Sequence, residues 1–423
     1  MLVMGGIVGS GIFINPYVVA QQIHTPFLIL GAWAFGGVVA LAGALVYAEL
    51  AARRPEVGGQ YAYLRDAFHP AVAFVYGWTL LLVTQTGGMA AVAVTFARYF
   101  LEITHAPVSD AVIAAAVLAL LSIINCFGVR AGSNVQSTLM LLKIGAIAAL
   151  VAAGLFFTHP AETGKPAMLD RPMSMDLVLA IGAALTPVLF AYGGWQTTSF
   201  VAAEMKNSIR DLPRALLIGV LGVVTIYLSV NVAYLHTLGA DGLKNTSTPA
   251  SAVMRIAFGE PGARFIAAGI TISTLGFLSH GMLTAPRVYF AMARDGVFFR
   301  SVGWIHPRTA APAVAIVLQG IVATIIALSG RYEQILNFVT SVDFLLFAAT
   351  GIALLVFRIR QPASTGFRTP GHPFTTLFFV LSCFLVVAST IYKYPGNSVI
   401  GLAIMCSGVP VYFLWSRLER KKS

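Results

Sequence analysis

The amino-acid sequence predicts an all-α protein that crosses a membrane many times, for two reasons. Hydrophobic residues make up 58% of the 423 residues and charged residues only 10%, whereas a soluble globular chain carries roughly 45–50% and about 25%. Apolar stretches of about 20 residues, each long enough to cross the hydrocarbon core as a helix, recur to the end of the chain. Helices are expected because unpaired backbone groups are too costly in lipid.

About twelve such stretches follow one another along the chain. By hydropathy we predict spans at about 1–23, 27–52, 69–101, 110–130, 134–158, 176–204, 213–238, 263–294, 310–329, 332–358, 373–392 and 396–416. The longest connections, near 159–175, 239–262 and 295–309, are expected to be loops or short interfacial helices. Residues 1–423 are therefore predicted to form a single membrane domain.

Lys and Arg residues lie mostly on one side of these spans. About 18 of the 27 fall on the side that holds Arg53, Arg54 and the tail RLERKKS, about 8 fall on the other side, and one lies within a span. Because positively charged loops stay in the cytoplasm, both termini are predicted to be cytoplasmic, in the cytoplasmic (inner) membrane. The net charge of +11 then needs no nucleic-acid partner.

The cysteines and the N-terminus predict no further chemistry. Cys126, Cys383 and Cys406 lie in apolar spans without metal-ligand spacing, so they are expected to be packing residues. No metal or cofactor is predicted. The first stretch lacks a basic segment and runs directly into more spans, so it is not expected to be a cleaved signal peptide.

Two spans carry a dense glycine cluster near their middle. Residues 5–13 read GGIVGSGIF and residues 190–195 read FAYGGW, with Gly9 and Gly193 184 positions apart. Spans 2 and 7 begin at a similar offset, which predicts two halves of five spans, at about 1–158 and 176–358, followed by helices 11 and 12 at about 373–416. Because each half has an odd number of spans, the second half enters the membrane in the opposite orientation. Interrupted helices at matching positions of two such inverted halves predict a binding site near the bilayer midplane.

The chemistry of a broken helix explains these glycines. Amide groups at the start of the resumed half favour a carboxylate, and carbonyl groups at the end of the preceding half suit an ammonium group. Glycine lets a ligand approach the main chain closely, and Ser10 adds a hydroxyl donor. The two ends together predict recognition of a free α-amino acid. A valine at Gly11 is expected to block binding while the protein still inserts.

Together with these residues, several longer stretches resemble the amino acid-polyamine-organocation (APC) superfamily. The stretches are GGIVGSGIF, GALVYAELAARRPEVGGQYAYLRDAF, FAYGGWQTTSFVAAEMKNSIRDLPRAL, APRVYFAMARDGVFF and SGVPVYFLW. The chain is most similar to the L-type amino acid transporter branch and its bacterial serine/threonine-exchanger relatives, over nearly all its length. The resemblance implies the LeuT-like fold, a 5+5 inverted repeat with broken helices 1 and 6.

The resemblance also implies roles for residues around the two breaks. Gly9, Ser10 and Gly11 would hold the substrate carboxylate. Main-chain groups around three residues would receive its amine, namely Ile7, Phe190 and Ala191. Phe190 would act as an aromatic gate, unless it is an ordinary core residue. The further pocket-lining positions are Gly193, Trp195 and Gln196.

Other stretches resemble the family with less direct consequence. Residues 55–63 resemble a cytoplasmic loop near the inner gate, or form only a tight turn. Glu204 is expected to be an ion-pair or cap residue. The first half-helix, about eight residues or 12 Å, is short for the family, so we expect a truncated start. The loop EITHAPVSD has no cysteine, where mammalian members pair with a glycoprotein, so no covalent heavy-chain partner is expected.

Two charged residues lie inside predicted spans. Lys143 in span 5 either snorkels to the surface or, as the resemblance implies, lies near the first break in place of the sodium ion of related carriers. A lysine that loses its proton in one state could also couple a proton. Asp343, about a third of the way into span 10, either pairs with a polar neighbour or contacts a cationic or polar substrate tail.

The predicted function is secondary transport of L-amino acids by alternating access. Neutral side chains are favoured because Gly193 and Gly194 stand where relatives that prefer cationic substrates can place an acidic residue. The alternative is a cationic amino acid or polyamine antiporter. An enzyme or a channel is a distant alternative, since the chain has no HExxH motif, nucleophile elbow or facing carboxylate pair. Proton symport, obligatory exchange and facilitated passage all fit.

Overall fold

The computed structural model describes residues 2–56, 58–127, 133–161, 168–169, 172–204, 207–307, 311–329, 332–362 and 366–420, and these residues form helices and no strand. The elements are α1 (Leu2–Ile7), α2 (Gly11–Ala20), α3 (Pro26–Arg53), α4 (Gln60–Ala67), α5 (Pro70–Thr79), the π-helix η1 (Leu80–Thr84), α6 (Gln85–Thr104), α7 (Asp110–Cys126), α8 (Ser133–Phe156), α9 (Met175–Tyr192), the 3₁₀-helix η2 (Trp195–Glu204), α10 (Ser208–Lys244), α11 (Pro249–Thr284), α12 (Pro286–Arg294), the 3₁₀-helix η3 (Arg300–Gly303), α13 (Ala313–Ser329), α14 (Tyr332–Arg360), α15 (Phe374–Lys393) and α16 (Pro395–Arg420).

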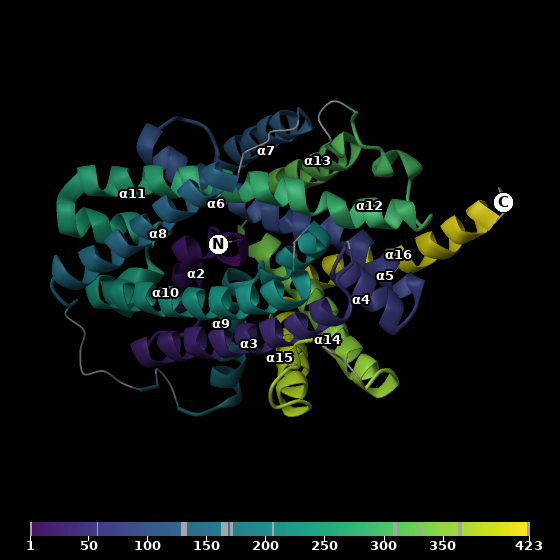
Figure 1. Ribbon diagram of the computed structural model, residues 1–423. Helices are drawn as coiled ribbons and strands as arrows, with labels where there is room; N and C mark the ends of the chain where they lie inside the picture. Colours follow the sequence, from purple (N-terminus) through teal and green to yellow (C-terminus); the bar gives the residue numbers. More distant parts are fainter. Residues whose placement is uncertain are drawn as a thin grey trace.

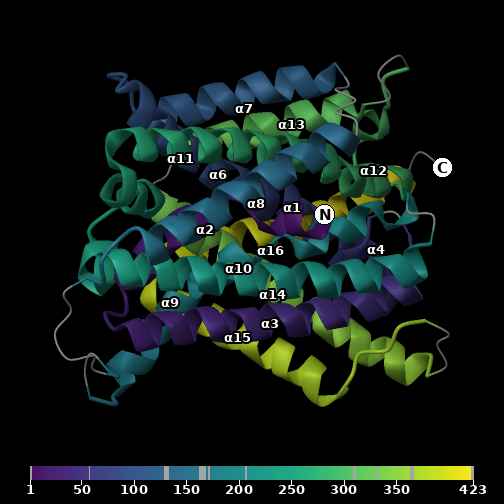
Figure 2. The same cartoon turned by 60° about the vertical axis from the view of Figure 1, so that its left-hand side comes forward.

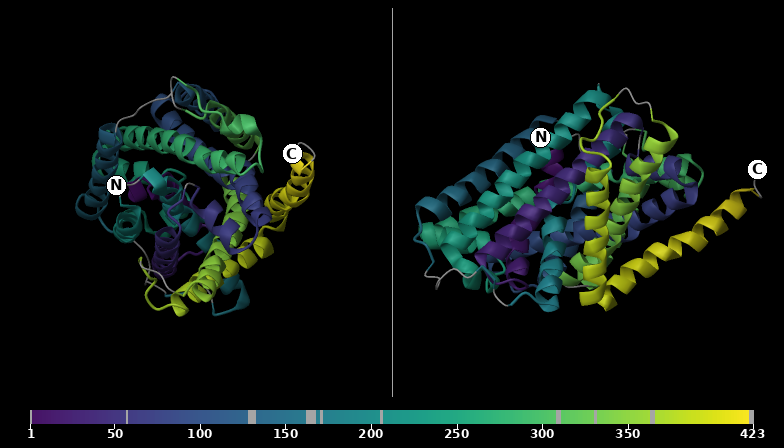
Figure 3. Two further views of the ribbon diagram at one scale, coloured as in Figure 1. Left: turned by 45° about the vertical axis from the view of Figure 1, so that its right-hand side comes forward. Right: turned by 90° about the horizontal axis from the view of Figure 1, so that it is seen from below.

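The long helices lie side by side in one bundle, with the short α1 and α2 among them (Figures 1 and 2). α1 contacts α10, α11 and η2, and α2 contacts α9 and α10, so the first, interrupted span is surrounded by longer helices. α16 runs along one side of the bundle, and its C-terminal end projects beyond it (Figure 3). It packs against α5, α14 and α15.

The predicted membrane spans agree with the helices. Among the described residues, 8 helices are long and apolar enough to cross a membrane, and four shorter apolar helices cover Gly11–Ala20, Asp110–Cys126, Leu141–Phe156 and Ala313–Ser329. Each predicted span coincides with one of these twelve. Large apolar side chains such as Phe156, 79% exposed, stand on the outside of the bundle, as expected of a surface that faces lipid rather than water. The protein is a polytopic all-α membrane protein.

The connection predicted at 239–262 is largely helical. α10 turns at Gly239, which has a φ of 64°, and continues to Lys244, whereas α11 begins at Pro249 and turns at Gly259, with a φ of 67°. A positive φ is readily adopted only by glycine, so these two residues separate the spans from the short helical ends between them. The sequence predicted a loop or a short interfacial helix at this place, and the described residues form short helical ends.

Corresponding helices of the two predicted halves pack against one another. α2 contacts α9, α3 contacts α10, α6 contacts α11 and α7 contacts α13. Such pairing is expected when a pseudo-two-fold axis relates two inverted halves. The boundaries of the halves, about 1–158 and 176–358, stay a prediction.

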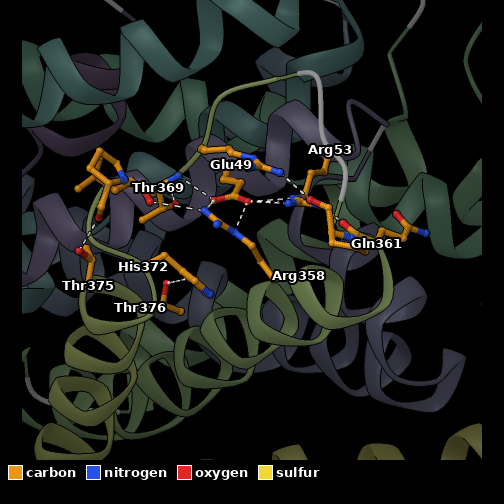
Figure 4. A network of polar contacts seen from close by, with 12 residues as sticks. Glu49, Arg53, Arg358, Gln361, Thr369, His372, Thr375 and Thr376 are labelled. Atoms are coloured by element: carbon orange, nitrogen blue, oxygen red, sulfur yellow. Dashed lines mark hydrogen bonds and ion pairs between the residues drawn. The ribbon is translucent and has the colours of Figure 1, made fainter.

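A buried ion-pair network ties one end of the bundle together (Figure 4). The fully buried Glu49 carboxylate, near the end of α3, accepts hydrogen bonds from Arg53 Nε at 3.0 Å and from Arg358 Nε at 2.8 Å. Its Oε2 accepts a further bond from the backbone N–H of Thr369 at 2.7 Å. Thr369 Oγ1 donates to Leu45 O at 3.0 Å. One carboxylate therefore joins α3, α14 and the segment that leads into α15.

We expect the substitution Glu49→Gln to lower the free energy of unfolding by about 3–5 kcal/mol, because it leaves the buried guanidinium group of Arg53 and the partly buried one of Arg358 without their counter-charge. Glu56→Gln is the matched control, since the Glu56 side chain is 50% exposed beside Arg65, and an exposed pair contributes about 1 kcal/mol or less. Melting of the two purified variants in detergent measures the difference. Equal melting temperatures would show that the buried network contributes little.

Candidate functional site

The first predicted break is present between α1 and α2. α1 ends at Ile7 and α2 begins at Gly11. Between them the Gly9 N–H donates to Ile7 O at 2.7 Å and the Phe13 N–H donates to Ser10 O at 3.0 Å, which are turn bonds rather than α-helical ones. The first amide groups of α2 point along its axis into this gap, where no earlier turn of helix supplies acceptors.

The second predicted break separates α9 from η2. α9 ends at Tyr192, and Gly194 has a φ of 108°. A Cβ atom at Gly194 would overlap Gly6 O of α1, so only glycine fits at this contact between the two breaks. The Gly194 N–H donates to Gln196 Oε1 at 2.8 Å, and Thr197 Oγ1 donates to Gly194 O at 2.7 Å. These side chains supply the bonds that an unbroken helix would have made.

A tyrosine from α10 joins the two breaks. The Tyr227 hydroxyl lies 3.1 Å from Ile7 O, the last carbonyl of α1, and 3.2 Å from Ala191 O, near the end of α9. Its ring packs edge-on against Trp33 and beside Tyr192, with centroids 5.7 Å and 5.1 Å apart. The tyrosine hydroxyl carries one hydrogen, so it donates to one of these carbonyls at a time. Because Ile7 O also accepts from the Gly9 N–H, a lone pair of Ile7 O is open to a ligand only when Tyr227 donates to Ala191 O. Sequence reasoning missed Tyr227, because one aromatic residue in an apolar span gives no signal.

Lys143 lies where the resemblance implies. Its side chain is 8% exposed, and its Nζ donates to Val8 O, inside the first break, at 2.5 Å. An ammonium group placed on the main chain of the break does not snorkel toward the surface. The role of this charge in coupling stays a prediction.

A second chain of polar contacts, also missed from the sequence, holds the middle of α2. Asn15 Nδ2 donates to Pro187 O of α9 at 2.6 Å, and the Tyr332 hydroxyl of α14 donates to Asn15 Oδ1 at 2.7 Å. The Arg98 guanidinium lies 5.4 Å from the centre of the Tyr332 ring, within cation–π range. Three helices are therefore held together beside the breaks.

A cavity of about 100 Å³ lies between the breaks, with room for several water molecules. Its lining includes the predicted residues Ile7, Gly9, Ser10, Gly11, Phe190, Ala191, Gly193, Gln196 and Asp343. It also includes residues that the sequence did not single out, among them Thr84, Gln85, Gly88, Phe277, His280 and Thr340. The two interrupted spans, α1–α2 and α9–η2, thus enclose one central cavity together with α6, α11 and α14.

Trp195 is the predicted lining residue that lies elsewhere. It is 3% exposed and packs edge-on against Tyr47, with ring centroids 4.6 Å apart, and in a stack on Phe347 at 5.3 Å. Phe347 lines the cavity, whereas Trp195 stands behind it. The wide indole is used here to fill space between η2, α3 and α14.

Gly11 lines the cavity and also has a packing role that the sequence did not indicate. A Cβ atom there would lie 2.6 Å from Ala191 Cα, so this glycine allows α2 and α9 to touch. A valine at Gly11 would separate the two helices, so Gly11→Val is expected to disturb their packing as well as binding. Gly9 is less crowded, with Phe277 Cε2 3.1 Å from the corresponding position.

Residues 55–63 approach the second break. Gly59, with a φ of 47°, is the N-cap residue of α4, and a Cβ atom there would lie 2.9 Å from Ser199 O of η2. Gln60 Nε2 donates to Thr350 Oγ1 of α14 at 2.9 Å. The segment is therefore packed against two helices rather than being a simple surface turn. Val57 and the side chain of Glu204 lie outside the described residues.

The end of α4 carries a further ionic contact. The Tyr61 hydroxyl donates to Asp295 Oδ2 at 2.9 Å, and Arg65 Nη1 donates to the same oxygen at 3.0 Å. Burial, and then the Asp295 carboxylate, raise the pKa of the Tyr61 hydroxyl well above its usual range, so the hydroxyl keeps its proton and remains a donor.

Comparisons with known proteins agree with this geometry. A family model described as amino acid permease matches residues 1–414. The b(0,+)-type amino acid transporter 1 of Homo sapiens is 29% identical, over 98% of this chain and 86% of its own length. The large neutral amino acids transporter small subunit 2 of Homo sapiens is 29% identical, over 98% and 78%. The serine/threonine exchanger SteT of Bacillus subtilis is 29% identical, over 97% and 94%.

Gly88 allows a direct test of the cavity, because it lines the cavity and a Cβ atom there meets nothing within 4 Å. We expect Gly88→Leu to fill the space and weaken amino acid binding at least about tenfold, a loss of roughly 1.4 kcal/mol, without lowering the melting temperature. Gly145→Leu is the control, since Gly145 is an exposed helix position with equally open space. Binding is measured by competition with a labelled amino acid. Unchanged binding in Gly88→Leu would place the substrate elsewhere.

Proposed function

Because the chain belongs to the amino acid permease family, we propose that it exchanges L-α-amino acids across the membrane, with the substrate held in the cavity between the two helix breaks. The observation that carries this proposal is the meeting of both breaks at one cavity, between α1 and α2 on one side and α9 and η2 on the other. Each break offers main-chain groups that a continuous helix would hide.

The substrate's own main chain matches these groups. Its carboxylate would lie against the amide groups at the start of α2, around Gly9, Ser10 and Gly11, where the helix dipole favours an anion. Its ammonium group would lie against Ile7 O and Ala191 O, which are both within hydrogen-bond distance of the Tyr227 hydroxyl. Each bond to a charged group contributes about 1.5–3 kcal/mol, enough for tight yet reversible binding.

Phe190 and Gln196 complete the pocket in this proposal. Phe190 lines the cavity and remains half-buried, so its ring is available to cover a bound substrate as a gate. Gln196 accepts from the Gly194 N–H and so fixes the shape of the second break. Gly193 adds no side chain to the wall, which suits a substrate with a neutral side chain.

We propose neutral amino acids as the main substrates. Two of the relatives named above are described as a transporter of large neutral amino acids and as a serine/threonine exchanger, and the cavity wall is largely apolar, with Met89, Val92 and Phe344 among its residues. A cationic amino acid or polyamine antiporter remains the alternative, because a carboxylate, Asp343, is part of the same wall.

The proposed orientation places both termini in the cytoplasm and the protein in the cytoplasmic membrane. It rests on the excess of Lys and Arg at one end of the spans, the end that holds Arg53 and Arg358. One of the relatives is named a small subunit. Residues 105–109, between α6 and α7, contain no cysteine, so any larger subunit would have to associate there without a disulfide.

Counterflow into proteoliposomes tests the proposed function. Vesicles preloaded with alanine, serine or leucine should take up labelled amino acid faster than empty vesicles, since an exchanger moves substrate in both directions, whereas a channel would show no such stimulation and an enzyme no uptake. Lysine, arginine, putrescine and cadaverine should compete less well. Stronger competition by these cations would favour the alternative substrate class, and the absence of any counterflow would refute the proposal.

The substitution Lys143→Met tests the proposed role of the buried ammonium group. Because it removes the charge that holds Val8 O, we expect counterflow to fall at least about tenfold, the effect of losing one charged hydrogen bond. Replacing sodium by choline should leave wild-type counterflow unchanged. Normal transport by a folded Lys143→Met protein, or a sodium requirement in the wild type, would contradict this role.

A further inference from the structure

Asp343 is a charged side chain for which the described part of the protein supplies no partner. It lies in α14, is half-buried and lines the central cavity. The other carboxylates inside the bundle are bound: Glu49, for example, accepts from Arg53, Arg358 and Thr369. A carboxylate within a membrane-spanning helix is costly unless something receives its charge. The surroundings of Asp343 suggest that the receiver comes from outside the protein.

Three hydroxyl groups beside the cavity are also unsatisfied. Ser10 Oγ, Thr84 Oγ1 and Thr340 Oγ1 are buried, line the same cavity and make no hydrogen bond with any described residue. Thr84 is the last residue of the π-helix η1, an irregularity that is frequent at functional sites. Thr340 stands one turn before Asp343 on α14. Buried polar atoms without partners are rare in folded proteins, and three of them in one cavity indicate a place for a polar ligand.

The groups that face Asp343 cannot neutralise it. The titratable side chains around it are Tyr47 of α3, Tyr76 of α5 and Cys383 of α15, together with His280 of α11, which lines the same cavity. Tyrosine and cysteine are neutral near pH 7, and histidine is mostly so. The buried Lys143 gives its ammonium group to Val8 O and forms no ion pair with Asp343. The counter-charge must therefore arrive with the transported species.

We propose that Asp343 is a site for one positive charge, filled by a proton when a neutral amino acid is bound and by the side-chain ammonium group when a cationic amino acid is bound. The inference rests on the proposed function and adds which substrates are carried together with a proton. In the first case the carboxylate binds one proton from the solution to become a carboxylic acid, and releases it on the other side. In the second case the ammonium group takes the proton's place, and no proton moves.

Thr84 and Thr340 fit both cases. Beside a protonated carboxyl group, a hydroxyl can accept its proton, and beside an ammonium group, both hydroxyls can accept while the carboxylate carries the charge. A neutral amino acid would then be carried together with one proton, and a cationic one alone. Exchange of a cationic for a neutral amino acid would move a proton in the direction of the neutral one.

The test compares competition by alanine with competition by ornithine and lysine, at about pH 6 and about pH 7.5, using labelled serine in proteoliposomes. In the wild type, alanine should bind more tightly at the lower pH, by at most about tenfold per pH unit because one proton binds, and the cations should not. In Asp343→Asn, alanine should lose its pH dependence, and the cations should bind at least about tenfold more weakly because their charged acceptor is gone.

Two further variants separate Asp343 from other groups. Glu333→Gln removes a carboxylate of the same helix that lies outside the central cavity, and it should behave as the wild type. His280→Gln removes the other titratable group of the lining and should keep the pH dependence, whatever its effect on rate. A vesicle-trapped pH dye should report proton entry with alanine but not with lysine.

Three results would overturn the inference. The first is alanine binding that does not depend on pH in the wild type, which needs no variant to fold. The second is Asp343→Asn protein that keeps the wild-type pH dependence and substrate ranking. The third is loss of the pH dependence in His280→Gln, which would assign the proton to histidine. Absence of counterflow with every amino acid would instead refute the proposed function, so the two failures are distinguishable.

Discussion

The constraint on which this structure depends is that main-chain polar groups inside a membrane must find partners. A helix can be interrupted there only where protein encloses the interruption. Both breaks meet this condition, since Tyr227 reaches Ile7 O and Ala191 O, Lys143 reaches Val8 O, and Gln196 accepts from the Gly194 N–H. Gln196 lines the cavity, and Tyr227 bonds Ile7 and Ala191, which also line it, so the contacts that stabilise the breaks lie at or directly behind the cavity wall. Stability of the fold and formation of the site have the same physical cause.

The cavity divides recognition between main chain and side chains. The groups from α1, α2 and α9 are carbonyl and amide groups, which suit the part common to all α-amino acids. The groups from η1, α6 and α14 are side chains, among them Thr84, Gln85 and Asp343. Substitutions in this second set could change which side chain is accepted without altering how the common part is held. A single fold can in this way serve carriers of neutral and of cationic amino acids.

The sequence predicted the spans and both breaks because each depends on local composition: long apolar runs, and glycines inside them. It did not predict the contacts of Asn15, Tyr227 or Tyr332, because a polar group on an apolar helix says nothing of which distant helix it meets. Trp195 was placed in the lining because it follows the second break, yet its ring packs behind the wall against Tyr47. Gly11 lines the cavity, but the sequence did not show that it also lets α2 touch α9 at Ala191.

The contact between Gly194 and Gly6 has a mechanical consequence. Here one backbone rests on another, with no side chain between them that could rotate and yield. α1 cannot move toward the second break without displacing it, so the two interrupted segments at this end of the cavity are expected to move together. Opening this end requires that α1 and the second break both move away from the cavity. A residue larger than glycine at position 194 would force these two segments apart. Movements of α1 and of the second break are thereby coupled, although the two segments lie far apart in the chain.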